Sequence, residues 1–504
     1  MMIQRTYQRY QLAAIRLTIR RVGPNRHERK DSMKHETEEE RWAYNCEDCV
    51  RTRECGEAET KIIKELGLLT VEAFQQKLFH PVLKAMTRGI RVDHAAKKQL
   101  IKELGEEFDR RQAFFREVLG HELNPRSPVQ MAKLFYTDLA QPVIMTRGKK
   151  GAPGHVTCDD EALMKIGARE PLLRPLVNAI ADVRTIGVLK STFAEAEPGP
   201  DGRMRSSFNI CGAPTFRLAS STDAFGSGCN LQNIPSDKSK MQGKAAARGT
   251  EFKLPNIRKL YIPDEGMTFF DLDLDRADLQ VVVWEAEDTM LKAALRSGVD
   301  VHILNAFVLS MKDPPPLEEL VETHPKYAEH RARLKHPREF AKVFCHGTNY
   351  GGSSRTMAAH TGRTVHEVDR AQALWFGAHP GIKRWHERTK LQINTKRFVE
   401  NRFGYRWYIF DRIDMALNEA LAWTPQSTVA CVINRAWMNL YDNLPEVEVL
   451  LQVHDSLAGQ FPAARKDELL PKIKKESIIT VPYDDPLIIP VGIKTSETSW
   501  GDCG

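Results

Sequence analysis

Three aspartates alternate with leucines in one short segment and could together hold a metal ion. Asp271, Asp273 and Asp275 are separated by Leu272 and Leu274. Residues two apart share a face in a β-strand, so the alternation predicts a strand with three carboxylates on one side. Neighbouring carboxylates repel one another and raise each other's pKa. A divalent cation such as Mg²⁺ relieves this repulsion because it prefers oxygen ligands. The segment therefore indicates a metal site or, as the alternative, the solvated face of a β-ribbon.

A second carboxylate lies between two short apolar runs near the C-terminal end. Asp455 follows the apolar run 449–453 and His454, and Leu457 comes soon after it. Apolar runs on both sides of this pair predict a β-hairpin with Asp455 at its tip. Two carboxylates on separate strands can hold a pair of metal ions that activates an attacking oxygen and stabilises a leaving one. An ordinary turn residue is the alternative interpretation.

Four side chains suited to phosphates and bases recur every four residues in the segment 336–352. Pro337 near its start and Gly351 near its end predict a helix. Residues four apart share a helix face, and those on this face are Arg338, Lys342, His346 and Tyr350. Two cations can bind phosphates and two rings can stack on a base, so this face fits a nucleoside triphosphate. The alternative is an ordinary basic helix surface.

Strands and long helices must together position these groups. Helical periodicity predicts helices over most of 38–200, with a loop at 144–158, and over 276–440. Strand-like runs alternate with turn residues at 200–275 and flank His454. Strands mixed with longer runs of helices predict an α+β fold.

Composition fits a large protein with a polyanionic partner. The chain has 504 residues, 42% of them hydrophobic and 28% charged, and its net charge is +7. No apolar run approaches the roughly 18 residues of a membrane span, so we expect no membrane and a cytoplasmic location, in the host cell if the chain is viral. The nine cysteines are irregularly spaced, which favours reduced thiols over a zinc site.

In order along the chain, these segments resemble motifs A, B and C of the DNA polymerase I family (family A), of bacteriophage type. Asp273 with Asp278 is similar to motif A, the helix at 338–351 to the fingers helix, and 453–455 to the palm hairpin of motif C. Further stretches that resemble the family are 124–130, 207–209, 215–221, 230–235, 257–263, 300–302 and 425–428. The resemblance covers about residues 65–504.

The resemblance implies a right-hand fold with an antiparallel palm sheet and mainly helical thumb and fingers. The expected division is 1–64 N-terminal arm and exonuclease-domain remnant, 65–200 thumb and connecting helices, 201–290 first part of the palm, 291–410 fingers, and 411–504 second part of the palm.

The resemblance also implies a role for each matching residue in a nucleotidyltransferase reaction that extends a primer in DNA replication. Asp273 and Asp455 would bind two Mg²⁺ ions, for which Mn²⁺ could substitute, with help from the Leu274 carbonyl; Lys342 would join them in catalysis. The expected nucleotide-binding residues for the incoming dNTP are Arg338, Lys342, His346, Tyr350, His302 and Asp278. The expected contacts to primer-template DNA are Arg217, Gln232, Asn233, Arg258, Gly351, Gln426 and His454. The reaction would be an in-line phosphoryl transfer driven by positioning and electrostatics.

Some positions depart from the family pattern. Asp278 replaces the usual Glu that screens out the ribose 2′-hydroxyl, His346 replaces Phe or Tyr, and Ser456 replaces Glu. Asn418 and Ala422 also replace polar or basic residues. We expect activity to survive these changes because both metal-binding aspartates are retained.

The N-terminal region predicts no proofreading in this chain. Tyr44 and Asp48 resemble the last motif of the family's 3′–5′ exonuclease, but the preceding 43 residues hold no convincing Asp-x-Glu strand. We therefore expect a separate exonuclease or processivity factor as a possible partner. The first 23 residues carry five arginines and no acid, which indicates a basic, poorly ordered arm rather than a transit peptide.

Three other functions remain open on the sequence, of which a nuclease that uses the acidic strand is the least favoured. A single-subunit RNA polymerase shares the Arg…Lys…Tyr-Gly helix, although Asp278 stands where such enzymes tend to have Gly. A catalytically inert DNA-binding replication protein is the remaining alternative, against which the retention of Asp273, Asp455, Arg338 and Lys342 argues.

Overall fold

The computed structural model describes residues 37–146, 153–222, 228–235, 240–249, 252–310, 312–410, 412–413 and 416–503. The chain forms two compact units, Met1–Glu72 and Ala73–Gly504. The basic arm predicted at the N-terminus falls outside the described residues, as does the centre of the loop predicted at 144–158. No helix among the described residues is long and apolar enough to cross a membrane.

The described part of the first unit is dominated by one helix, α3 (Glu38–Glu65). It begins at a capping box, in which the Thr37 hydroxyl accepts the N–H of Glu40 and the Glu40 carboxylate accepts the N–H of Thr37. None of its residues is buried, and Tyr44 is 62% exposed. The exonuclease remnant predicted from Tyr44 and Asp48 therefore stays a prediction.

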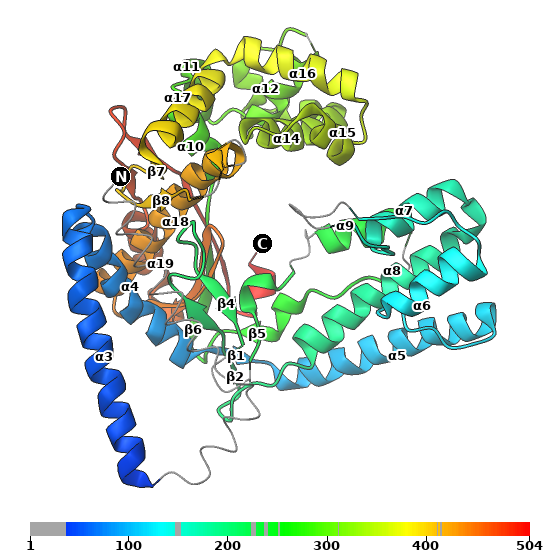
Figure 1. Ribbon diagram of the computed structural model, residues 1–504, viewed down its shortest axis with the longest axis horizontal. Coiled ribbons are helices and arrows are strands. Elements are labelled where there is room, and N and C mark those ends of the chain that lie inside the picture. The colour runs from blue at the N-terminus through cyan, green and yellow to red at the C-terminus, as the bar shows by residue number, and fades with distance from the viewer. Residues whose placement is uncertain are drawn as a thin grey trace. The chain divides into compact units, whose positions relative to one another are not determined.

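A four-stranded antiparallel sheet lies at the centre of the second unit (Figure 1). Its strand order is β13-β6-β10-β9, and the bounds are β6 (Met267–Leu274), β9 (Glu448–Val453), β10 (Ser456–Pro462) and β13 (Val491–Ser496). β6 is an inner strand, because β10 pairs along one edge and β13 along the other. The predicted antiparallel sheet and its hairpin are confirmed.

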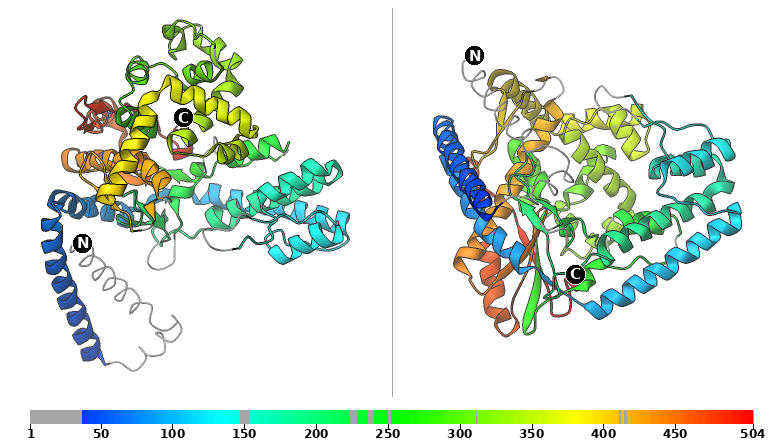
Figure 2. Two further views of the ribbon diagram at one scale, coloured as in Figure 1. Left: turned by 45° about the horizontal axis from the view of Figure 1, so that its top comes forward. Right: turned by 60° about the horizontal axis from the view of Figure 1, so that its bottom comes forward.

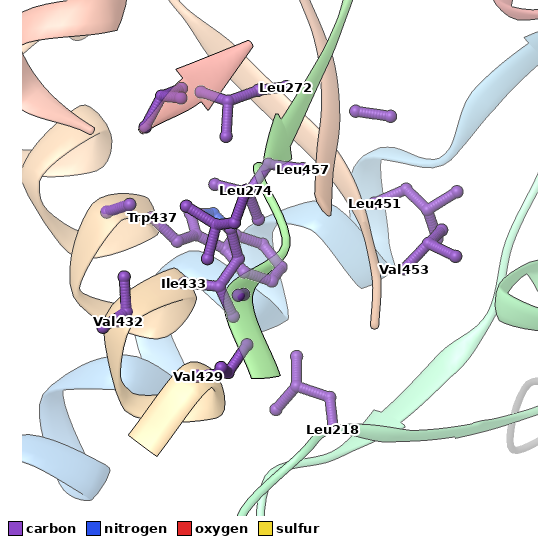
Figure 3. Close-up of a cluster of buried hydrophobic side chains, with 14 of the residues drawn as sticks. Leu218, Leu272, Leu274, Val429, Val432, Ile433, Trp437, Leu451, Val453 and Leu457 are labelled. Carbon is purple, nitrogen blue, oxygen red and sulfur yellow. The ribbon is translucent and has the colours of Figure 1, made fainter. Parts of the chain in front are cut away.

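An apolar core packs between this sheet and the long helix α18 (Leu417–Asn443). Figure 3 shows side chains of this core from the strands, from α18 and from Leu218. Its labelled members are Leu218, Leu272, Leu274, Val429, Val432, Ile433, Trp437, Leu451, Val453 and Leu457. Burying an aliphatic side chain contributes about 1.5–3 kcal/mol, so this layer fixes the strand ends that carry the polar residues.

Two further helices and the remaining short strands complete this layer. Helix α4 (Leu69–Arg88) buries Leu78, Val82 and Ala85 in the same core, so it packs with the sheet although it falls within the range expected for the thumb. The other helix here is α19 (Lys466–Glu476), and the short strands are β1 (Ile90–Val92), β2 (Arg203–Met204), β3 (Ser207–Asn209), β4 (Ala219–Ser221), β5 (Tyr261–Ile262), β7 (Phe398–Glu400), β8 (Arg406–Tyr408), β11 (Thr480–Val481) and β12 (Leu487–Ile488). Four short 3-10 helices accompany them: η5 (Leu231–Asn233), η6 (Ile257–Leu260), η9 (Ala463–Arg465) and η10 (Trp500–Asp502).

A first group of helices follows β1 and has its own core around Phe115, Phe135 and Ile180. Its members are α5 (His94–Leu119), α6 (Pro128–Ala132), η2 (Lys133–Asp138), α7 (Asp160–Arg169), η3 (Pro171–Leu173), α8 (Arg174–Val188) and η4 (Leu189–Ala194). Helix α9 (Lys240–Ala247) reaches this group, because the Arg248 guanidinium that follows it binds the buried carboxylate of Asp182 at 2.6 Å.

A second group of helices separates the two halves of the sheet in sequence. Its members are α10 (Ala277–Glu285), α11 (Thr289–Arg296), α12 (Val301–Ser310), η7 (Leu317–Leu320), α13 (Tyr327–Arg333), α14 (Lys335–Asn349), α15 (Ser354–Thr361), α16 (Val365–Ala378) and α17 (Pro380–Lys396). Helices α11 to α13 enclose a separate small core. Figure 2 shows the two helical groups as distinct bodies within this unit, each continuous with the sheet layer.

Candidate active site

The carboxylates of Asp273 and Asp455 stand on neighbouring strand ends. Asp273 lies opposite Ser456 in the β6–β10 pair, and the N–H of Leu274 donates to the Asp455 carbonyl at 3.3 Å. Asp455 sits in the two-residue turn between β9 and β10, where His454 has a φ of 56°. Residues such as His tolerate this left-handed conformation better than β-branched ones do. The turn therefore places the second carboxylate beside the first.

Burial and neighbouring negative charges raise the pKa values of both carboxylates. Withdrawal from water, followed by the negative charges of Asp455, Asp271 and Asp275, raises the pKa of Asp273 to about 7. Burial also raises the pKa of Asp455, and the negative charge of Asp278 adds to the rise. Part of the Asp273 side chain still contacts water, so water screens part of the repulsion and limits the effect of burial. Two carboxylates in this condition favour a bound cation.

The prediction of three aspartates on one strand face is right for Asp271 and Asp273, which alternate with buried leucines on β6, and wrong for Asp275. Strand β6 ends at Leu274, and Arg276, with a φ of 49°, turns the chain into α10, so Asp275 leaves the strand. The Asp271 carboxylate accepts the indole N–H of Trp500 at 3.0 Å and lies 3.7 Å from Arg258. Among the described residues, no three His, Cys, Asp or Glu side chains form a metal-binding group.

A buried glutamine supports the turn that carries Asp455. The Gln452 amide donates to the His454 carbonyl at 2.6 Å and accepts the amide of Gln232 at 3.0 Å. Gln452 is fully buried, so losing either bond would leave a polar group without water. The sequence did not lead us to Gln452, although a polar residue inside the apolar run 449–453 was a usable signal. Gln232, predicted to contact DNA, contacts this glutamine from η5, and its role towards DNA stays a prediction.

One end of the predicted α14 face is held by a carboxylate. The Arg338 guanidinium donates to Asp300 at 2.8 Å, and the Tyr327 hydroxyl donates to the same carboxylate at 3.0 Å. Burial lowers the pKa of the nearby His302 to about 4, and the positive charges of Arg338 and Lys342 add to this fall against the negative charge of Asp300. Arg338, Lys342 and His302 therefore form one electrostatic group, with Asp300 as a partner to which we had assigned no role.

Farther along α14, two rings approach the first turn of α10. The rings of His346 and Tyr350 are 4.6 Å apart, edge to face. Burial raises the pKa of the Tyr350 hydroxyl, and the negative charge of Asp278 adds to it. The Asp278 carboxylate accepts a hydrogen bond from Arg217 at 3.4 Å, whereas the buried Tyr350 hydroxyl makes no hydrogen bond of normal length to any residue that the structure describes.

These groups form one site rather than two. The charge of Asp278 acts on Asp455 and on Tyr350, and the charge of Lys342 acts on both His302 and His346. Two carboxylates from the sheet thus share an electrostatic neighbourhood with the cations and rings of α14.

Four other residues that were predicted to contact DNA differ in their burial and in their contacts. The Arg258 guanidinium stacks 4.1 Å above the Trp500 ring, on the side of β6 that carries Asp271. Asn233 is exposed in η5, and Gln426 is half-buried in α18. Gly351 has a φ of 74°, and a Cβ there would lie 2.5 Å from the Asn418 side chain. Glycine is therefore required at the end of α14.

The fold and this arrangement of charges define a polymerase domain. A solved structure with the same fold is the POL domain of Pol1 from M. smegmatis, in complex with DNA primer-template and dNTP. The two structures match with a TM-score of 0.71 at 21% sequence identity, over 88% of this chain and 72% of that one.

The chain belongs to DNA polymerase family A, whose family model matches residues 94–502. The thermostable DNA polymerase I of Thermus filiformis is 28% identical over 419 residues, which cover 81% of this chain and 45% of the relative. The DNA polymerase I of Pseudomonas aeruginosa is 27% identical over 431 residues, covering 82% and 42%. The chain thus spans less than half the length of these bacterial relatives. The predicted family and α+β fold are confirmed; the bacteriophage type stays a prediction.

Proposed function

We propose that this chain is a template-directed DNA polymerase that adds dNTPs to a primer 3′-OH. The observation that carries the proposal is the meeting of Asp273 and Asp455, far apart in the chain, at adjoining strand ends within the electrostatic reach of α14. Membership in family A and the fold of a polymerase domain support the same conclusion.

The two aspartates fit divalent cations. Their oxygens are the hard ligands that Mg²⁺ prefers. Burial and then the neighbouring negative charges raise the pKa of Asp273, and the positive charge of a cation would offset both effects. Asp273 and Asp455, with the Leu274 carbonyl, would hold the ions. When bound, two such ions activate the attacking oxygen and stabilise the leaving one.

The α14 residues would receive the triphosphate. Lys342 is exposed and can reach phosphate oxygens directly. Arg338 binds Asp300 through Nε, so a terminal nitrogen of the same guanidinium would contact phosphate while that bond is kept. His302, kept neutral by its lowered pKa, can donate to a phosphate oxygen without adding charge. Tyr350 and Gly351, at the end of α14, would face the templating base.

The remaining assignments are part of the same proposal. The helices from α5 to α8 would form the thumb, α11 to α17 the fingers, and the sheet with α18 the palm. DNA contacts would come from Arg217, Gln232, Asn233, Arg258, Gln426 and His454. We also propose a role in bacteriophage DNA replication.

A primer-extension assay with single nucleotides tests this function. The wild-type chain should extend a primed DNA template with the complementary dNTP in Mg²⁺, and Asp455→Asn should lose at least about a thousandfold in rate. Preference for rNTPs would instead favour an RNA polymerase. If the chain binds DNA but extends no primer at any concentration of Mg²⁺ or Mn²⁺, an inert DNA-binding protein would be the better interpretation.

A further inference from the structure

The last residue of α14 is held by two aromatic side chains from neighbouring helices. The indole N–H of Trp375, on α16, donates to the Asn349 side-chain oxygen at 3.0 Å. The imidazole of His386, on α17, donates from Nε2 to the Asn349 carbonyl at 2.8 Å. Asn349 is 2% exposed and Trp375 is fully buried. We call Asn349, Trp375 and His386 the helix-end latch.

The latch completes the hydrogen bonding of a helix end. The last carbonyls of a helix have no partner within it. Here the N–H of Gly351 donates to Thr348 at 3.0 Å, and that of Gly352 donates to Gly347 at 2.9 Å. The Asn349 carbonyl accepts its hydrogen bond from the His386 side chain. Since Gln372 also donates to the Gly352 carbonyl at 2.8 Å, side chains from α16 and α17 fix the chain on both sides of Tyr350.

The position of this helix end matters because of what stands on it. Tyr350 follows Asn349 directly, and its ring contacts His346 while its hydroxyl lies near Asp278. Gly351 follows with a φ of 74°, and a Cβ there would lie 2.5 Å from the Asn418 side chain, so glycine is strongly favoured. A small rotation of the helix end would move both residues, because their own backbone would rotate with it, and close packing leaves little room for the side chain to compensate.

We propose that Asn349, Trp375 and His386 are positioning residues that set the accuracy of nucleotide selection. The inference rests on the proposed function, in which Tyr350 and Gly351 face the templating base. None of the three touches the reacting groups; they act through the backbone of residues 349–351. Discrimination between a correct and a mismatched base pair depends on a rigid pocket, and the latch supplies that rigidity from α16 and α17.

The latch can be opened one hydrogen bond at a time. Trp375→Phe removes the indole N–H and keeps a ring in place. His386→Leu removes the imidazole donor, and His386→Gln restores an N–H donor at similar reach. His366→Leu is the matched control, because His366 is an exposed histidine on α16.

Single-turnover incorporation of the correct and of a mismatched dNTP is the readout. Trp375→Phe and His386→Leu should each raise the ratio of mismatched to correct kcat/KM about five- to tenfold, the range open to one lost hydrogen bond. His386→Gln and His366→Leu should stay within about twofold of wild type. A purely structural role would lower thermal stability without changing this ratio, and an unchanged ratio in both opened variants overturns the proposal. Equal loss of accuracy in His386→Gln would also overturn it, because shape rather than the hydrogen bond would then be decisive.

Amide hydrogen exchange separates this inference from the proposed function. The peptide spanning residues 347–352 of the full chain should exchange at least about threefold faster in His386→Leu than in wild type, without any nucleotide. Faster exchange in a chain that extends no primer would uphold the latch and reject the polymerase activity. Unchanged exchange in both opened variants would reject the latch whatever the activity.

Discussion

Asp278 provides the most direct test of how the proposed site would distinguish a dNTP from an rNTP. Its carboxylate accepts a hydrogen bond from Arg217 at 3.4 Å, and the buried Tyr350 hydroxyl beside it makes no hydrogen bond of normal length to any described residue. The family resemblance gives this position the task of screening out a ribose 2′-hydroxyl. A carboxylate that Arg217 holds and that no normal-length bond from Tyr350 restrains can lie away from that hydroxyl. We therefore expect wild-type discrimination against rNTPs to be loose.

Asp278→Glu should tighten the discrimination. The change lengthens the side chain by one carbon–carbon bond, about 1.5 Å, which brings a carboxylate oxygen within reach of the Tyr350 hydroxyl. Satisfying a buried hydroxyl with a charged partner is worth about 1.5 kcal/mol. If this energy holds the carboxylate against the sugar, the ratio of kcat/KM for dNTP to that for rNTP should rise about tenfold.

The assay is steady-state incorporation of one complementary dNTP or rNTP on the same primed template. Asp369→Glu is the control, because it lengthens an exposed carboxylate on α16 and should leave the ratio unchanged. A ratio in Asp278→Glu that equals or falls below the wild-type ratio would refute the reasoning, since the longer side chain would then not be acting on the sugar.

Three further outcomes follow from the same geometry. Lys342→Ala should raise KM for the dNTP at least about tenfold with little change in primer-template affinity, measured by separate kinetic and DNA-binding titrations, because under the proposed function the exposed ammonium would contact only the triphosphate. Removing divalent cations with EDTA should abolish extension yet leave the circular dichroism spectrum unchanged, since the strands that carry Asp273 and Asp455 pair without a metal; a collapse of the spectrum would contradict this. Asp288→Ala should destabilise the protein by about 3 kcal/mol in urea unfolding at pH 7, because it removes both the cap of α11 and the buried partner of His379. Although burial alone raises the pKa of Asp288, hydrogen bonds from His379 and the backbone hold it below its ordinary 3.8, so this stabilisation is complete above that value. The difference between variant and wild type should therefore shrink as acid protonates the wild-type carboxyl below about pH 4, and a difference that does not change with pH would count against the ion pair.

Local patterns in the sequence determined the main pieces of the site. Alternation placed Asp273 on a strand, two apolar runs placed Asp455 in a hairpin turn, and the four-residue spacing placed Lys342 and Tyr350 on one helix. Each of these predictions depends only on the spacing of side chains along a single strand or helix, which the backbone geometry sets. The order of these pieces along the chain was sufficient to indicate family A.

The tertiary structure decided which polar groups face one another. Asp275 left the carboxylate face because the chain turns at Arg276, and Arg258 stacked on Trp500, which lies far along the chain. The hydrogen bond from Gln232 to Gln452 and the one from His386 to Asn349 depend equally on distant segments. Such pairings are set by how separate layers pack around a shared core, and a repeat along one element carries no information about what packs against it. The sequence by itself therefore determined which residues can do the chemistry, and only the packing of the sheet against its helices decided how they are held.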